Sequence, residues 1–327
     1  MDVCQPTPHG PLWSTETMTP QAQPNHGPFR PLARAPRTAP AAAVAAGVLL
    51  AVLVGGVGTA RAAWRHITSV LAANGNASQL ERNDFTPMDR AQLDRLDAQT
   101  QAEALLERAV GESDGAVEQI ASRVDRWQGR IQWNSQIATL TTAALTSNDL
   151  RVRQSGVEVE LAAYGLAKNA GSLSYVLHAA ASRDHAKKIW ALWSLGLLGN
   201  RGVGTSLAVQ ALTAHLKDSD QDSRRWAVAG LALVGSPEII TPLLRAMHDD
   251  PAPEVRESAA SSLAESGMLT REQRLAAVPQ LLNYVEDPTL DKQTQTWAFQ
   301  ALACITGQRL PNDSGAWRLW YTAAKVN

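Results

Sequence analysis

The chain has 327 residues and an almost balanced charge, with 30 Lys and Arg against 31 Asp and Glu. This length can bury a substantial core and allows about two domains. Residues 149–327 carry 18 basic and 18 acidic side chains. The chain therefore lacks the basic excess of a phosphate-binding surface, and no nucleic-acid partner is expected. The two cysteines, Cys4 and Cys304, lie far apart and exclude both a disulfide framework and a thiolate metal site.

The N-terminal part of the chain is predicted to contain no folded domain. Residues 1–37 are rich in Pro, Thr, Gln and Ala without an apolar period, which is typical of a disordered tail. Residues 38–60 carry no charge, and 23 residues of helix would span about 34 Å, enough for a bilayer core. This segment is therefore predicted to be a single transmembrane helix, followed by a linker over residues 61–85.

Two other interpretations of residues 38–60 stay open. A secretory signal would place its cleavage site at Ala60-Arg61-Ala62, so that the chain is secreted after cleavage near Ala62. A buried helix of a soluble domain is the third, weakened by the lack of a polar face. The slight excess of Arg before the segment favours an anchor with the repeat domain in the periplasm or outside the cell.

Residues 86–148 are predicted to be the helical N-terminal part of the solenoid described next. Thr86 can cap a helix that begins at Pro87 and runs to Val110, with Leu93 and Leu96 among its inward residues. A second helix follows Asp114, and a third covers residues 131–145. No stretch alternates with the period of two that strands require.

The clearest pattern is a repeat over residues 149–327. Four helical segments carry an Ala followed four residues later by a Leu and then a small residue, at spacings of 36, 32 and 39 residues. Because one helix pair cannot bury its apolar face, such pairs stack, and an all-α fold is predicted, an α-solenoid. The predicted repeat core comprises Trp190, Ala191, Leu195, Trp226, Ala227, Leu231, Ala259, Leu263, Trp297, Ala298 and Leu302.

The segment from Asp250 to Ala260, Asp-Pro-Ala-Pro-Glu-Val-Arg-Glu-Ser-Ala-Ala, closely resembles the core motif of the HEAT-repeat family. The resemblance is to its short bacterial form, the PBS-lyase HEAT-like repeats, and it covers residues 149–327. Residues 305–320 are similar to the C-terminal cap of such bacterial proteins. The resemblance implies a solenoid of HEAT-like helical pairs. The first unit departs from the pattern, with Glu158 and Glu160 in its first helix.

Motifs that carry chemistry are absent from the sequence. The glycine-rich stretch 199–204 lacks the Lys-Ser/Thr of a phosphate loop, and no Gly-x-Ser-x-Gly elbow occurs. No histidine precedes a glutamate, which excludes the iron site of the HEAT-like deoxyhypusine hydroxylase, and no His-x-x-x-His pair occurs. The histidines are His9, His26, His66, His178, His185, His215 and His248. The sequence therefore predicts no catalytic, cofactor-binding or metal-binding residue, no cofactor, and a protein that is not an enzyme.

The tryptophans admit two interpretations. Trp190, Trp226 and Trp297 share one repeat position, and Trp193 lies one turn from Trp190. Packing in the seams between repeats is favoured. The alternative is an aromatic stripe that anchors a partner, since Trp is enriched where partners bind.

These observations predict a non-catalytic scaffold for protein–protein interaction, anchored in a bacterial membrane or exported, with an unidentified protein partner. The second helix of each pair is expected to line the binding face. A HEAT-like lyase or cofactor-carrying enzyme is one alternative, and a purely structural envelope component is another. The partner-binding positions predicted on the second helices are Gln210, Arg245, Gln280 and Asn283.

Overall fold

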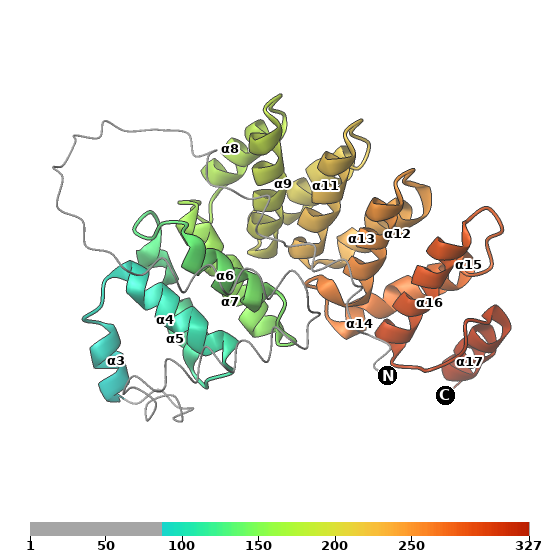
Figure 1. The fold of residues 1–327 in the computed structure, drawn as a ribbon, viewed down its shortest axis with the longest axis horizontal. Helices are drawn as coiled ribbons and strands as arrows, with labels where there is room; N and C mark the ends of the chain where they lie inside the picture. The colour runs from blue at the N-terminus through green and yellow to red at the C-terminus, as the bar shows by residue number, and fades with distance from the viewer. Residues whose placement is uncertain (1–86, 327) are drawn as a thin grey trace, which may run out of the picture. The chain divides into compact units, whose positions relative to one another are not determined.

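The computed structural model describes residues 87–326, and this part of the chain consists of helices joined by turns, with no strand among those residues (Figure 1). Short 3₁₀-helical turns precede α12 and α15. A π-helical turn, Ser262–Ser266, extends α13. The α-helices are α3 (Pro87–Leu93), α4 (Ala98–Val110), α5 (Ala116–Trp127), α6 (Ser135–Leu145), α7 (Leu150–Ala163), α8 (Ala170–Ala180), α9 (His185–Asn200), α10 (Thr205–His215), α11 (Gln221–Val234), α12 (Ile240–Asp249), α13 (Pro253–Ser261), α14 (Arg271–Arg274), α15 (Val278–Tyr284), α16 (Lys292–Thr306) and α17 (Ser314–Val326).

Short polar side chains fix where many of these helices begin. Asp184 accepts a hydrogen bond from the Lys187 backbone N–H at 3.1 Å, and Asp220 accepts one from the Ser223 N–H at 2.8 Å. Each bond satisfies a donor that the first helical turn leaves open. Gly235 ends α11 in the left-handed conformation, with φ of 66°, where a residue with a Cβ would be strained.

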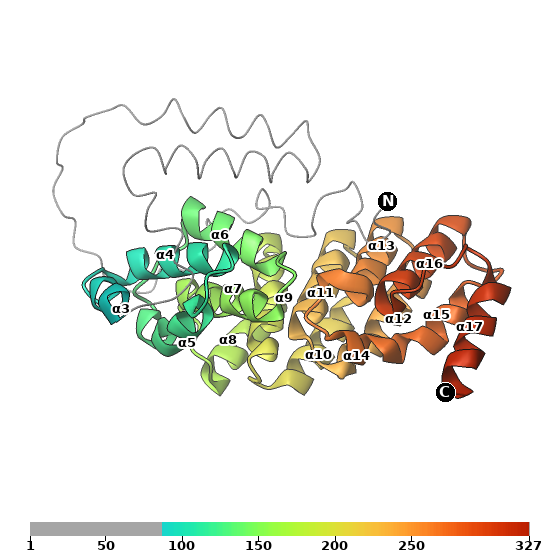
Figure 2. The ribbon, with the colours of Figure 1, turned by 90° about the horizontal axis from the view of Figure 1, so that it is seen from below.

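The helices of the repeats lie in two layers. Helices α7, α9, α11, α13 and α16 pack one against the next in chain order. Figure 2 shows α9, α11, α13 and α16 on one side, and α8, α10, α12 and α15 on the other. Because each helix pair shares its apolar face with its neighbours, one hydrophobic core runs along the stack. The described part of the chain is thus the predicted all-helical repeat solenoid.

Two glycines allow the closest contact between repeats. A Cβ on Gly196 of α9 would lie 2.5 Å from the Gly230 carbonyl oxygen of α11, and a Cβ on Gly230 would lie 2.5 Å from the Leu192 oxygen. The two backbones therefore touch directly. The predicted small positions of the repeat include Gly196 but not Gly230. Of the residues predicted to form the repeat core, all but the half-buried Trp190 are buried.

The N-terminal helices differ from the prediction in one place. The single helix expected up to Val110 is two helices, α3 and α4, separated by a turn. Asp97 caps α4 by accepting from the Thr100 N–H at 3.0 Å, and this local bond competes with a continuous helix. Leu96 was expected to point inward but is 41% exposed. The boundary predicted at residues 148 and 149 stays a prediction, and α5 and α7 pack across it.

The prediction of a single-pass membrane protein is corrected. Among residues 87–326 no helix combines the length and the apolar character needed to cross a bilayer. The prediction relied on the length and lack of charge of residues 38–60, which lie outside the described residues, as do the predicted tail, linker and Thr86 cap.

Candidate functional site

A ladder of salt bridges joins consecutive repeats. The ammonium of Lys188 on α9 lies 2.9 Å from Asp218, which precedes α11. Arg224 on α11 donates two hydrogen bonds to Asp250, at 2.8 and 3.1 Å. Arg256 on α13 repeats the arrangement with Asp291, at 2.9 Å. In each case a basic group near the start of one helix binds a carboxylate just before the equivalent helix of the next repeat, so these groups have a structural role.

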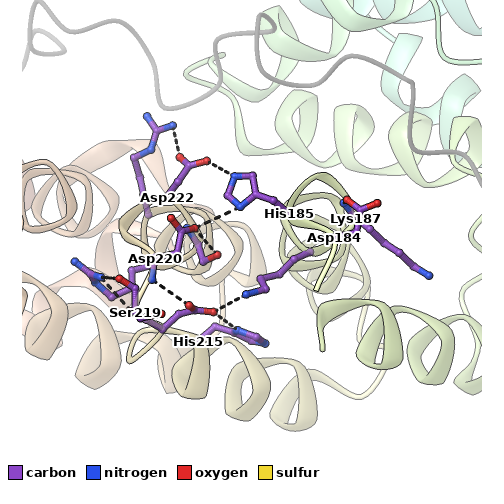
Figure 3. A network of polar contacts seen from close by, with 12 residues as sticks. Asp184, His185, Lys187, His215, Ser219, Asp220 and Asp222 are labelled. Carbon is purple, nitrogen blue, oxygen red and sulfur yellow. Dashed lines mark hydrogen bonds and ion pairs between the residues drawn. The ribbon is translucent and has the colours of Figure 1, made fainter. Parts of the chain in front are cut away.

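Figure 3 shows the polar network around the first step of this ladder. Asp218 faces Lys188 and also His215, whose Nδ1 lies 3.6 Å away. His185 at the start of α9 reaches across the seam to Asp220 at 3.5 Å and Asp222 at 3.1 Å. The hydrogen bond from Lys188 holds the pKa of Asp218 below its usual range. The side chains of this network are therefore occupied in holding two repeats together.

His248 closes another seam. Its Nε2 lies 3.0 Å from Asp287 of the next repeat, and its ring packs 4.8 Å from the ring of Tyr284, centre to centre. Burial lowers the pKa of His248, but hydrogen bonds to Asp287 and Asp249 outweigh it and raise the pKa above its usual value. Hydrogen bonds from Thr289 and His248 lower the pKa of Asp287 to about 2.

We expect the free energy of unfolding to fall between about pH 6 and pH 8 because His248 loses its charge there. A raised histidine pKa contributes stability that is complete below the unfolded value and is lost as pH rises through the folded value. The lowered pKa of Asp287 makes the free energy of unfolding depend on pH only at acidic pH, where the pH falls below the ordinary value of 3.8. Urea unfolding at pH 6 and pH 8 should show a smaller difference in the free energy of unfolding for His248→Gln than for the wild type.

The control for this prediction is His178→Gln, which alters an exposed histidine of α8. Groups elsewhere in the chain titrate equally in all three proteins, so only the difference between variants counts. An identical pH dependence in His248→Gln and the wild type would contradict the assignment.

Four aromatic side chains from separate segments form a second constellation, which we call the aromatic row. Trp133 precedes α6, Tyr164 ends α7, Tyr175 lies on α8 and Trp190 on α9. Ring centres are 5.1 Å apart for Trp133 and Tyr164, 6.1 Å for Tyr164 and Trp190, and 6.0 Å for Trp190 and Tyr175. Tyr175 is 37% exposed and the others are half-buried. Open ring surface of this kind suits a flat, conjugated ligand.

A buried carboxyl group lies next to the row. Glu160 precedes Tyr164 by four residues on α7, so both side chains share one face of the helix. The Glu160 carboxyl accepts a hydrogen bond from the indole N–H of Trp193 at 2.7 Å. Burial raises the pKa of Glu160 to about 7, and the hydrogen bonds from Trp193 and Thr141 offset only part of this effect. Burial and the charge of Glu160 raise the pKa of Tyr164 as well.

The neighbouring Glu158 shows why Glu160 is unusual. Glu158 is also buried, but it lies 2.8 Å from the Arg201 guanidinium and 3.1 Å from the Lys168 ammonium. Its negative charge is therefore compensated by two cations. Glu160 meets neutral donors instead, and a carboxyl of this kind can both hold and release a proton near neutral pH.

The two interpretations of the tryptophans apply to different residues. Trp193, Trp226 and Trp297 are buried between helices, with Trp193 and Trp226 in edge-on contact at 5.8 Å. Trp190 alone of this set carries open surface, in the aromatic row. Reasoning from the sequence missed the row because its members come from four segments. The one available signal was the pair of carboxylates within the apolar run of residues 157–161.

The four residues predicted to bind a partner are exposed on α10, α12 and α15, all in one layer. Two of them take part in local contacts: Asn283 donates to Gln280 at 3.3 Å and accepts from Arg318 of α17 at 2.8 Å. The structure does not join these positions to the aromatic row, and their role stays a prediction.

The stacked pairs define the chain as a helical-repeat protein. A model of the HEAT repeats matches residues 173–264 and 209–303, so this part of the chain resembles HEAT repeats in sequence as well as in fold. The bilin biosynthesis protein RpcF of Synechococcus sp. (strain WH8020) is 39% identical over 69 residues, which are 21% of this chain and 33% of that protein. The chain thus matches about a third of the length of this relative.

The solved structures that resemble part of the chain include engineered and designed proteins. An engineered protein is 20% identical, covers 66% of this chain and 94% of its own, and has a TM-score of 0.32. A computationally designed armadillo repeat protein for modular peptide recognition is 16% identical, covers 62% of this chain and 99% of its own, and has a TM-score of 0.33.

The similarity to RpcF corrects the predicted function. A non-catalytic scaffold was expected, and the chain was expected not to be an enzyme. The similarity to a bilin biosynthesis protein favours the alternative instead, a HEAT-like lyase or cofactor-carrying enzyme. The expectation relied on the absence of linear motifs, and such motifs do not report groups that only packing brings together, as in the aromatic row.

Proposed function

We propose that this protein is an enzyme of the HEAT-like lyase class that acts on a bilin, an open-chain tetrapyrrole. The observation that carries the proposal is the 39% identity to RpcF over 69 residues. The site that suits such a ligand is the aromatic row with Glu160. No other constellation among the described residues combines open aromatic surface with a carboxyl group near its pKa at neutral pH.

Each part of this site has a physical task. Trp190 meets Tyr164 and Tyr175 edge to face, at 68° and 65°, so a conjugated ligand stacks on one of these rings and meets the edges of its neighbours. Glu160 lies one helical turn from Tyr164, and its pKa of about 7 suits it to hold or release a proton when a ligand changes the charge at the row. Trp193 fixes the orientation of the Glu160 carboxyl through the hydrogen bond of 2.7 Å.

A protein partner fits the same proposal as the acceptor or donor of the bilin. The exposed residues Gln210, Arg245, Gln280 and Asn283 provide a polar surface on α10, α12 and α15 for such a protein. In this proposal the surface positions a protein whose bilin is processed at the aromatic row. In this proposal, protein binding and bilin processing are therefore two tasks of one enzyme.

The proposal predicts that the purified full-length chain binds biliverdin, with a change in visible absorption and an induced circular dichroism signal. Trp190→Ala should weaken the binding about tenfold because it removes the central ring of the row. The matched control is Trp320→Ala, which removes a partly buried ring of the C-terminal cap helix α17. Absence of any biliverdin signal with the wild type would overturn the proposed function.

A further inference from the structure

One cation next to the aromatic row has no partner among residues 87–326. Lys187 lies on α9 beside Lys188, which belongs to the salt-bridge ladder. The Lys187 ammonium forms no ion pair or hydrogen bond within the described part of the chain, and only its backbone N–H is engaged, by Asp184. Figure 3 shows the Lys187 side chain directed away from the network that occupies its neighbours.

The position of Lys187 relates it to the aromatic row. It precedes Trp190 by three residues, and residues three apart lie on the same face of a helix. The Trp190 ring in turn contacts the rings of both Tyr164 and Tyr175. A ligand lying on these rings therefore meets an available ammonium group at the edge of the site.

The nearby acidic groups leave that ammonium available. Asp184 caps α9, Asp218 pairs with Lys188, and Asp220 and Asp222 face His185. Glu160 is buried beside Trp193 and has no cation at its carboxyl. The site thus offers aromatic surface and a positive charge, which is the complement of a flat anion.

We propose that the aromatic row binds a planar conjugated carboxylate, with the rings of the ligand on Trp190 and its neighbours and its carboxylate paired with Lys187. This inference rests on the proposed function for the identity of the ligand, since the propionate side chains of a bilin supply such carboxylates. The further claim is that Lys187 favours a ligand with a free carboxylate over the same ligand with that group esterified.

The test compares biliverdin with biliverdin dimethyl ester, which keeps the conjugated system and lacks the charges. Both are titrated against the full-length wild type, Lys187→Ala and the control Lys217→Ala, which alters an exposed lysine two residues after α10. Lys187→Ala should weaken biliverdin binding about fivefold and leave ester binding unchanged. Lys217→Ala should bind both compounds like the wild type.

The possible results separate the two proposals. Equal affinity of Lys187→Ala and wild type for biliverdin would overturn the role of Lys187 while leaving the proposed function in place. An equal loss of affinity for biliverdin and its ester would also overturn that role, because Lys187→Ala would then have disturbed the aromatic row and not an ion pair. Failure of both compounds to bind the wild type would overturn the proposed function and this inference with it.

Discussion

Arg224→Ala is expected to lower the free energy of unfolding by about 3–5 kcal/mol. The guanidinium side chain is 10% exposed and the Asp250 side chain 3%, and two hydrogen bonds of 2.8 and 3.1 Å join them. Removing Arg224 leaves the Asp250 carboxylate buried without its cation. The backbone N–H of Ala252, at 2.9 Å, compensates only part of that charge.

Arg225→Ala is the matched control for this prediction. Arg225 also pairs with a carboxylate, Asp222 at 2.9 Å, but the two side chains are 37% and 38% exposed. Water screens such a pair, so we expect a loss below about 1 kcal/mol. Chemical unfolding followed by circular dichroism distinguishes the variants. Equal losses for Arg224→Ala and Arg225→Ala would contradict the structural importance of the buried pair.

Gly196→Ala is expected to destabilise the protein by about 3 kcal/mol, although alanine is the better helix former. Its methyl group would lie 2.5 Å from the Gly230 oxygen and 2.9 Å from the Gly230 Cα. Both are backbone atoms, so α9 and α11 would have to move apart. We expect a fall in the melting temperature of about 6–12 °C.

Gly111→Ala provides the comparison for the glycine contact. A Cβ there would lie 3.4 Å from the Glu107 oxygen and 3.6 Å from the Arg108 oxygen, which are ordinary contact distances. The melting temperature of this variant should therefore stay close to that of the wild type. If Gly196→Ala melts at the same temperature as Gly111→Ala, the two helices do not approach each other as closely as the structure has them.

The solenoid could be predicted because its determinants repeat along the chain. Ala227 and Leu231 of α11 have equivalents in α9, α16 and the helical segment that begins with α13. The spacing of about 36 residues between equivalent positions is the length of one helix pair. Basic residues at one repeat position, such as Arg224, form the ladder between repeats. The break between α3 and α4 could not be read from apolar spacing, because it depends on a single cap at Asp97.

The candidate site could not be predicted because its residues do not repeat. Glu160 and Tyr164 belong to the first unit, which departs from the motif, and they meet Trp190 and Trp193 only through packing. The sequence also gives no sign that Glu158 finds two cations and Glu160 finds none. This difference in surroundings gives Glu160 a pKa of about 7.

The most direct test of the proposed enzyme is a search for conversion of its ligand. The full-length protein is incubated with a molar excess of a bilin, alone and together with candidate thiol-containing acceptor proteins. The visible spectrum and the masses of the bilin and proteins are followed over time. The proposal predicts that more than one bilin per protein is altered or attached, and that Glu160→Gln slows this more than it weakens binding. Recovery of all the bilin unchanged under every condition would contradict the proposal.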